Sequence, residues 1–274
     1  MISTPTQNGF IVPKSIDFCI EKTLECGQVF RFKKVDKEHY LVYTIDKKCE
    51  VFEKNGEYHF ITNDPDYFKN YFDIETDYGK IYDSLMEFEE LKNILPLSKG
   101  IRILKQELFE TIIGFIISQN NFIGRIQKII EKMCEKYGEN KGDYFAFITP
   151  EEYRKISREE FRELGMGFRD VYLDFNRKNI TDEFLEKLKN IEMNEAEKML
   201  KSLHGISHKV AACVMLFALS HTGYYPTDTW IFKANKTDEL NTPYKVKLFF
   251  ESRYGNLAGY AQQYLFYAKR NLKL

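Results

Sequence analysis

The first quarter of the chain alternates between apolar and polar residues. Three segments carry this period of two, which predicts strands with one face in a core and the other in water. They are residues 28–32, 40–45 and 58–62. Turn stretches follow at 46–48 and 54–56, and the second, Lys-Asn-Gly, is a strong hairpin signal. We therefore expect a small antiparallel sheet over about residues 17–61, preceded by a loose polar arm over residues 1–15.

Beyond residue 63 the apolar positions follow helical spacing. The segments with this pattern, or with an apolar run of helical length, are residues 67–72, 78–92, 107–118, 151–155, 158–164, 210–219, 244–252 and 259–273, together with a helix that runs through Tyr137. Asn120 or Asn121 is expected to cap the helix that ends at Tyr137. The pattern as a whole predicts an α+β protein. A small N-terminal antiparallel β domain, residues 1–97, precedes an all-α domain, residues 98–274.

The stretch from Leu203 to Cys213 predicts a helix end, a tight hairpin and a second helix. Gly205 stands where a hairpin between helices needs a residue that adopts positive φ, and Ser207 is a good N-cap. The helix over residues 210–219 is apolar on nearly every face, so we expect it to be buried. Such a hairpin leaves backbone N–H groups unpaired at a helix N-terminus, which is a ready phosphate site.

Lys209 is the only charged residue between Ser207 and Ser220. It stands in the first turn of its helix, where the helix dipole disfavours a cation. One interpretation is that the side chain simply extends to water. The other is that its amine serves chemistry, and Asp228, the expected cap of the next helix, supplies a carboxylate downstream. A phosphate-binding hairpin, an amine and a carboxylate together suit chemistry on a nucleic acid backbone.

Charge is distributed unevenly along the chain. The net charge of −1 argues weakly against a nucleic-acid partner. However, residues 99–136 carry a net charge of +3 and residues 201–274 one of +6, whereas residues 1–98 and 137–200 are acidic. Positive charge therefore gathers in two segments that carry motifs, as expected of a local DNA-binding surface on a nearly neutral protein.

Cysteine usage and hydropathy exclude several classes of protein. The five cysteines are Cys19, Cys26, Cys49, Cys134 and Cys213. They are odd in number and no pair has metal-ligand spacing, so we expect no disulfide framework, no metal site and no cofactor. The N-terminus lacks a basic-then-apolar signal and no apolar run approaches membrane length. The expectation is a cytoplasmic protein without a membrane partner.

The motif L-x-G-I-S-x-K-V-A-x-C, residues 203–213, followed by P-x-D, resembles the helix-hairpin-helix DNA glycosylase superfamily. The lysine resembles that of the bifunctional glycosylase/lyase members, and Cys213 points to the 8-oxoguanine DNA glycosylase branch. The resemblance implies that the helical domain has the helix-hairpin-helix glycosylase fold. It also implies that Lys209 and Asp228 are catalytic and that Gly205 and Ser207 bind DNA.

Four further segments resemble family motifs. By resemblance, Gly27 in G-Q-x-F-R reads the damaged base through its carbonyl, Asn120 fills the gap left by the flipped base, and Arg125 reads the orphaned cytosine. The remaining matches are the wedge Phe168, the base-binding Arg169, and the base-contacting Cys213, Gln262 and Phe266. Each has a structural alternative. Gly27 can mark a bulge, the Asn residues can cap, the glycine turn before Arg169 can end a helix, and Phe266 can pack in a core.

The resemblance implies a bifunctional DNA glycosylase/AP lyase that excises 8-oxoguanine from duplex DNA in base excision repair. Lys209 would act through a Schiff base and β-elimination, so the chemistry needs no metal. The alternatives are a glycosylase of the same fold for another damaged purine and a non-catalytic helix-hairpin-helix DNA-binding protein. The expected partner is double-stranded DNA containing 8-oxoguanine, bound by a monomer.

Overall fold

The structure is a computed structural model that describes residues 1 and 3–271 and falls into two compact units. One unit, here the sheet unit, comprises Met1–Val42, Lys48–Lys105 and Ser220–Leu274. The other, here the hairpin unit, comprises Tyr43–Lys47 and Gln106–Leu219. The boundary expected between residues 97 and 98 follows the order of elements along the chain. Compactness instead groups the last 55 residues of the printed sequence with the N-terminal ones.

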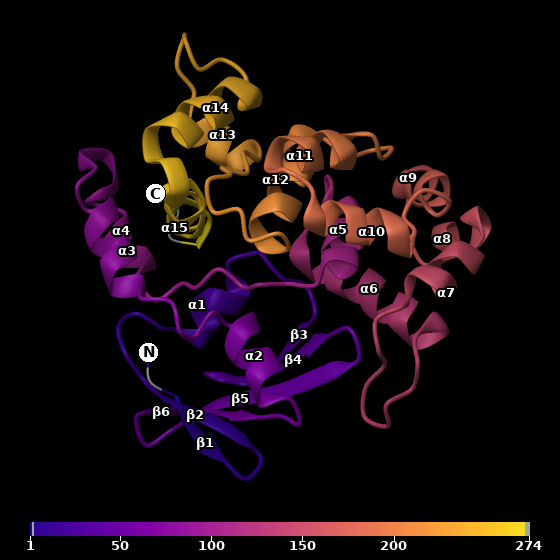
Figure 1. The fold of residues 1–274 in the computed structure, drawn as a ribbon, viewed down its shortest axis with the longest axis horizontal. Coiled ribbons are helices and arrows are strands. Elements are labelled where there is room, and N and C mark those ends of the chain that lie inside the picture. The colour runs from indigo at the N-terminus through magenta and orange to yellow at the C-terminus, as the bar shows by residue number, and fades with distance from the viewer. Residues whose placement is uncertain (2, 272–274) are drawn as a thin grey trace. The chain divides into compact units, whose positions relative to one another are not determined.

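The sheet has the strand order β1-β2-β6-β5-β4-β3 (Figure 1). Its strands are β1 (Thr4–Thr6), β2 (Gly9–Pro13), β3 (Phe32–Asp36), β4 (His39–Thr44), β5 (Lys47–Lys54) and β6 (Glu57–Ile61). Antiparallel pairing sets Val51 opposite Phe60. The β5–β6 turn confirms the hairpin signal, since Asn55 and Gly56 both adopt positive φ, 55° and 80°, as a two-residue turn of this type requires.

One face of the sheet forms a core with two helices. Alternate residues of β4 and β6 are buried, which confirms the period of two in the sequence. Phe18, Ile20 and Leu24, in and just before α1 (Ile20–Glu25), pack against this face. So do the aromatic residues of α2 (Pro65–Tyr71). The predicted antiparallel sheet with one buried face is therefore confirmed.

Three N-terminal expectations were wrong. Residues 1–15 are not a loose arm, because β1 and β2 lie in them and β2 pairs with β6. Residues 20–25 form α1 instead of β structure. The segment 28–31 lies outside any strand, because the buried amide of Gln28 bonds to backbone groups and holds the chain in an irregular turn.

The remaining helices of the sheet unit come from two distant parts of the chain. They are α3 (Tyr78–Leu85), η1 (Glu89–Leu91), α4 (Leu95–Ser98), α13 (Thr229–Asn235), α14 (Pro243–Tyr254), η2 (Gly255–Leu257) and α15 (Ala258–Asn271). α15 packs against α4, α13 and α14. α1 lies between the sheet and α15 (Figure 1), and the Lys22 amine sits 5.9 Å from the ring centre of Tyr267. α15 therefore contacts helices from both parts of the chain that form this unit.

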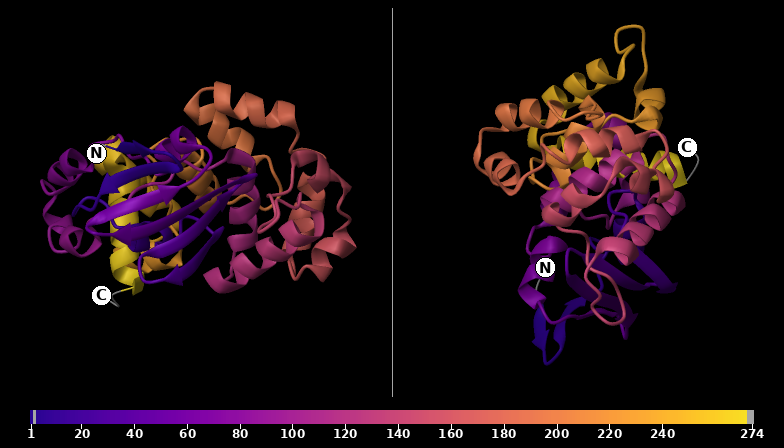
Figure 2. Two further views of the ribbon diagram at one scale, coloured as in Figure 1. Left: turned by 90° about the horizontal axis from the view of Figure 1, so that it is seen from below. Right: turned by 90° about the vertical axis from the view of Figure 1, so that its right-hand side faces the viewer.

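The hairpin unit is helical apart from the tip of the β4–β5 hairpin. Its helices are α5 (Leu108–Ser118), α6 (Ile123–Tyr137), α7 (Pro150–Lys155), α8 (Arg158–Glu163), α9 (Arg169–Asn176), α10 (Asp182–Asn190), α11 (Met193–Lys201) and α12 (His208–Phe217). α12 packs against α5 and α11, and α9 packs against α5 and α8. Figure 2 shows the same elements from two further sides. Within the described residues, no helix has the length and apolarity needed to span a bilayer.

The caps show how the sequence sets these boundaries. Thr149 and Ser157 each form a capping box with a glutamate three residues on. The expectation that Asn120 or Asn121 caps α6 was wrong, because the N-cap is Phe122 and no side chain bonds the first turn there. The Asn121 side chain instead accepts from the N–H of Phe122 and donates to Ile117 O.

Candidate active site

The hairpin between α11 and α12 has the predicted geometry. Gly205 adopts φ +80°, which side chains rarely tolerate. A Cβ there would also come 2.5 to 2.9 Å from the Cδ2 and Cδ1 ring carbons of Tyr172. The Ser207 hydroxyl accepts a hydrogen bond of 3.3 Å from the N–H of Val210 and caps α12. The exposed start of α12 is therefore built to present backbone N–H groups to an anion.

Lys209 lies in the first turn of α12, ahead of a run of buried residues from Val210 to Phe217. Its Nζ lies 4.9 Å from the ring centre of Phe115 on α5, within the range of a cation–π contact. Within the described hairpin unit, Nζ forms no ion pair with a carboxylate. Cys213 follows one turn later on the same side of α12 and is buried. The amine is therefore partly exposed and held against an aromatic face.

The loop after α5 is held by a buried arginine. Asn120 has φ +48° and is exposed. The guanidinium of Arg169 donates to the carbonyls of Gln119, Asn120 and Met166, with a distance of 2.9 Å to Asn120 O. Arg169 is only 2% exposed, and burial, followed by the nearby Arg125 charge, lowers its pKa. The structure thus gives Arg169 a role that the sequence did not predict, as a clamp on the Asn120 loop.

The other predicted DNA contacts of this unit are exposed. Arg125 donates to the carbonyl of Gly165, at 3.2 Å, in the glycine turn before α9. Phe168 is 50% exposed, and its ring lies 4.5 Å from the guanidinium carbon of Arg169. Phe122, which sequence reasoning missed, is 69% exposed beside the Asn120 loop. A large apolar residue inside a polar loop was the signal that could have found it.

In the sheet unit, Asp228 caps α13 as predicted. Its Oδ1 accepts a hydrogen bond of 2.9 Å from the N–H of Ile231. Pro226 and Thr227 before it are buried, which fixes the entry to the helix. Trp230, at the second position of α13, is 56% exposed. The Asp228 side chain is thus anchored at one oxygen and partly exposed.

Gly27 forms the turn after α1, with φ +84°. The next residue, Gln28, is fully buried. Its Nε2 donates to Thr23 O at 2.8 Å and to Arg102 O at 2.7 Å, and its Oε1 accepts from Leu104 N at 2.9 Å. Three hydrogen bonds therefore fix the backbone beside Gly27, which confirms a turn and excludes a simple strand bulge.

Gln262 and Phe266 lie one turn apart on α15, on the same face as expected. Gln262 is 3% exposed and its Oε1 accepts from Gln263 Nε2 at 2.8 Å. Phe266 is half-buried, and the Arg270 guanidinium lies 5.8 Å from its ring centre. α15 contacts α13, which Asp228 caps, and it adjoins α1, which Gly27 follows. One helix thus supports the predicted residues of this unit.

The structure therefore sorts the predicted residues into two groups. Gly27, Asp228, Gln262 and Phe266 belong to the sheet unit. The hairpin unit holds Asn120, Arg125, Phe168, Arg169, Gly205, Ser207, Lys209 and Cys213.

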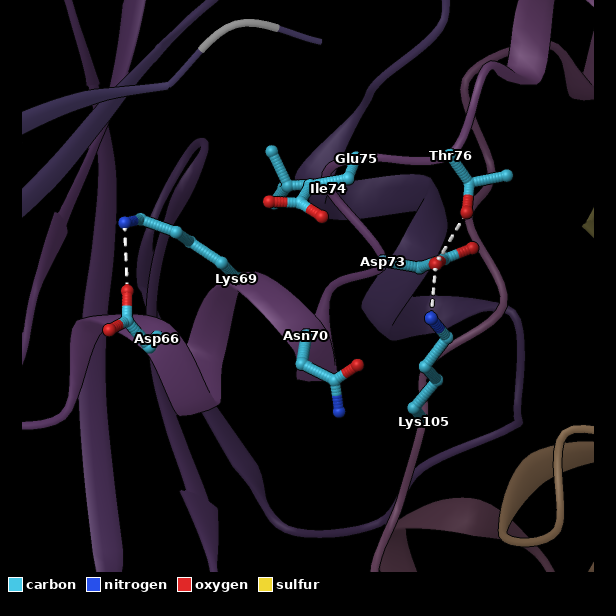
Figure 3. A pocket seen from close by; sticks show the side chains of 8 residues that line it. All are labelled: Asp66, Lys69, Asn70, Asp73, Ile74, Glu75, Thr76 and Lys105. Carbon is cyan, nitrogen blue, oxygen red and sulfur yellow. Dashed lines mark hydrogen bonds and ion pairs between the residues drawn. The ribbon is translucent and has the colours of Figure 1, made fainter.

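A polar cavity of about 410 Å³ lies elsewhere in the sheet unit (Figure 3). Four of its charged side chains form two pairs: Lys105 Nζ with Asp73 Oδ1 at 2.7 Å, and Lys69 Nζ with Asp66 Oδ1 at 3.0 Å. Asp73 also accepts hydrogen bonds from Thr76 and Tyr78. No predicted site residue lines this cavity, so we regard it as a structural network. Among the described residues, no group of three or more His, Cys, Asp or Glu could hold a metal ion.

Comparisons with known proteins identify the family of the chain. Residues 10–112 match the family model of the 8-oxoguanine DNA glycosylase N-terminal domain. The whole chain superposes on an 8-oxoguanine glycosylase/lyase of Clostridium acetobutylicum, solved with double-stranded DNA containing cytosine opposite 8-oxoguanine. The TM-score is 0.92 at 31% identity, with 100% of this chain and 99% of that chain covered. The chain belongs to the 8-oxoguanine DNA glycosylase/lyase family.

Curated relatives in this family are similar over different lengths. The N-glycosylase/DNA lyase OGG1 of Arabidopsis thaliana is 32% identical over 194 residues, which is 62% of this chain and 52% of the plant protein. That match therefore spans about half of the plant protein. The N-glycosylase/DNA lyase of Saccharomyces cerevisiae is 28% identical, with 94% of this chain and 85% of the yeast protein covered.

Proposed function

We propose that this chain is a bifunctional DNA glycosylase/AP lyase that excises 8-oxoguanine from double-stranded DNA in base excision repair, with Lys209 as its nucleophile. The observation that carries the proposal is the position of the amine. It lies directly behind the Gly205–Ser207 hairpin, against the Phe115 ring and without a carboxylate partner in its described unit. A lysine kept out of ion pairs can supply the neutral amine that a nucleophile requires.

The proposed reaction begins with extrusion of the damaged nucleotide, because its sugar cannot be reached inside the duplex. Lys209 Nζ forms a bond to C1′ of the deoxyribose while the bond from C1′ to the base nitrogen breaks. The base leaves with the electron pair and takes up a proton. Ring opening then gives a protonated Schiff base, and loss of a proton from C2′ expels the 3′ phosphate by β-elimination.

The other residues are assigned roles by their family motifs and their geometry. Asp228, anchored by its cap hydrogen bond, is proposed to stabilise positive charge that develops on the sugar. The carbonyl of Gly27 is proposed to accept a hydrogen bond from N7–H of the lesion, which guanine lacks. Gln262, Phe266 and Cys213 are proposed to contact the flipped base.

Extrusion of the damaged nucleotide leaves a gap in the duplex, which side chains of the protein are proposed to fill. Asn120 is proposed to enter it, presented by its clamped loop, while Arg125 reads the unpaired cytosine. Phe168 is exposed beside Arg169 and is proposed to wedge beside that base, and Phe122 is a second exposed ring available for the same task. A monomeric state and a cytoplasmic location stay predictions.

Borohydride trapping tests the proposal. The protein is mixed with a duplex that carries 8-oxoguanine opposite cytosine, sodium borohydride is added, and covalent adducts are resolved by denaturing electrophoresis. We expect an adduct on lesion DNA and none on undamaged DNA. Base release without an adduct would indicate a glycosylase that uses water, and binding without base release would indicate a non-catalytic DNA-binding protein. Either result would overturn the proposal.

A further inference from the structure

The hairpin that carries Lys209 is short and has few internal hydrogen bonds. α11 ends at Lys201 and α12 begins at His208. Within the turn, the N–H of Ile206 donates to Leu203 O at a long 3.3 Å. Gly205 has a φ of +80°, which favours glycine over residues with a side chain. Such a turn needs contacts from outside itself if it is to keep one geometry.

Asn176, the last residue of α9, supplies those contacts. Its Oδ1 accepts a hydrogen bond of 2.8 Å from the N–H of His204, and its Nδ2 donates one of 2.8 Å to the carbonyl of His204. The side chain is fully buried. One amide therefore satisfies both backbone groups of the residue before Gly205, and a buried amide so engaged is costly to replace.

The rings of α9 complete the contact. His204 packs edge-on against Tyr172 and Phe175, with ring centres 5.1 and 5.0 Å apart. The ring of Tyr172 also fills the space that a side chain at position 205 would need. At its other end α9 begins with Arg169, which clamps the Asn120 loop. One helix of eight residues thus holds both segments proposed to enter or grip DNA.

We propose that Asn176 is a positioning residue for the reaction. Its amide fixes the hairpin backbone, which sets both the N–H groups that bind phosphate and the start of the helix from which Lys209 reaches the sugar. This inference rests on the proposed function. A displacement of about 1 Å at a reacting group can cost on the order of 100-fold in rate. Loss of the two hydrogen bonds between Asn176 and His204 therefore affects chemistry as well as binding.

The first test compares Asn176→Ala with Asn179→Ala. Asn179 is a matched control, because it is exposed and its side chain bonds only to the nearby Phe175 carbonyl among the described contacts. Two quantities are measured: affinity for a duplex with a tetrahydrofuran abasic analogue, and the single-turnover excision rate per borohydride-trappable site. Normalising to trappable sites removes the effect of misfolded protein. We expect Asn176→Ala to lose about 10- to 100-fold in rate and to bind more weakly, with Asn179→Ala unchanged.

The second test uses pH and covers the case in which Asn176→Ala folds poorly. In Asn176→Asp, a protonated carboxyl presents one donor and one acceptor to His204, as the amide does, whereas the ionised form faces the His204 carbonyl with a like charge. Burial raises the pKa of such a carboxyl. The rate of this variant, taken as a ratio to the unmutated protein at each pH, should therefore recover between pH about 7.5 and 5.5.

Wild-type affinity and rate per trappable site in Asn176→Ala would overturn the inference, and so would a flat rate ratio in Asn176→Asp. Failure of the proposed function has a different signature. In that case the unmutated protein binds the abasic analogue yet forms no reducible adduct. The affinity measurement still decides whether Asn176 positions the hairpin.

Discussion

In both units a glycine turn at the proposed site is held by a fully buried side-chain amide. The two amides differ in how many residues separate them from the turn that they hold. Gln28 directly follows Gly27 and bonds to backbone groups at residues 23, 102 and 104. Asn176 stands 28 residues before His204 and bonds to it at both backbone groups. The glycines have nearly equal φ, +84° and +80°. The conformation of each turn therefore depends on its own glycine, while the side chain that holds the turn can stand far away in the sequence.

The units also differ in how far their predicted side chains are exposed. In the hairpin unit Asn120, Arg125 and Phe168 are exposed, while Arg169 beneath them is engaged by carbonyls. In the sheet unit Gln262 is itself buried. The hairpin unit thus presents three exposed side chains, whereas the predicted side chains of the sheet unit range from the buried Gln262 to the partly exposed Asp228 and Phe266.

The largest expected effect is on the hairpin. Gly205→Ala must place a Cβ at positive φ, which costs about 1–2 kcal/mol, and must also displace the Tyr172 ring. We expect single-turnover excision to fall at least about 100-fold. Gly142→Ala is the matched control, since Gly142 has φ +97° in the same unit with nothing within 4 Å of the added Cβ. If both variants excise at the same rate, the fit between the hairpin and α9 is irrelevant to function.

Asp228→Asn tests a charge in the sheet unit. The amide can still cap α13 but carries no charge, so we expect unchanged thermal unfolding and a rate about 100-fold lower. Asp77→Asn serves as the control, because Asp77 caps α3 through the N–H of Lys80 in the same way. Unchanged turnover in Asp228→Asn would remove this carboxylate from the mechanism.

Gly27→Ala tests lesion recognition against a control with the same backbone strain. Gly56 has φ +80° and open space around the added Cβ, so Gly56→Ala pays the same conformational cost outside the proposed site. A hydrogen bond to the lesion, against an unpaired acceptor on guanine, is worth about 1–3 kcal/mol, or about 5- to 150-fold in selectivity. We expect a loss of that size in Gly27→Ala alone. Equal selectivity in the two variants would place lesion reading elsewhere.

The smallest effect on rate is expected at Arg125 and Arg169, which differ in burial because Arg125 is exposed and Arg169 is buried. Arg125→Ala should leave the free energy of unfolding within about 0.5 kcal/mol and weaken the preference for cytosine opposite the lesion. Arg169→Ala should lower the free energy of unfolding by about 2–3 kcal/mol, because buried carbonyls lose a charged donor. Chemical denaturation and excision opposite each of the four bases measure both. Equal stability of the two variants would contradict the clamp.

Several features that depend on neighbouring residues were predicted from the sequence. The caps at Ser207 and Asp228, the positive φ of Gly205 and the buried helix α12 are all confirmed. Each depends on local backbone chemistry.

Features that depend on distant residues were missed. β2 looks like part of a polar arm because its partner β6 is about 50 residues away, and β1 pairs only with β2. The two roles of α9 were missed because an arginine and an asparagine at helix ends have no periodic signature. A contact across many residues leaves no local pattern in one sequence.

The central claim is that Lys209 is the nucleophile, and the most direct measurement is to locate the adduct. The borohydride-reduced complex is digested with protease and nuclease, and the modified peptide is sequenced by mass spectrometry, with Lys209→Gln and the exposed Lys201→Gln treated in parallel. The account predicts a single modified residue, Lys209, no adduct or strand cleavage in Lys209→Gln despite retained DNA binding, and unaltered trapping in Lys201→Gln. An adduct at any other amine, or trapping that persists in Lys209→Gln, would contradict it.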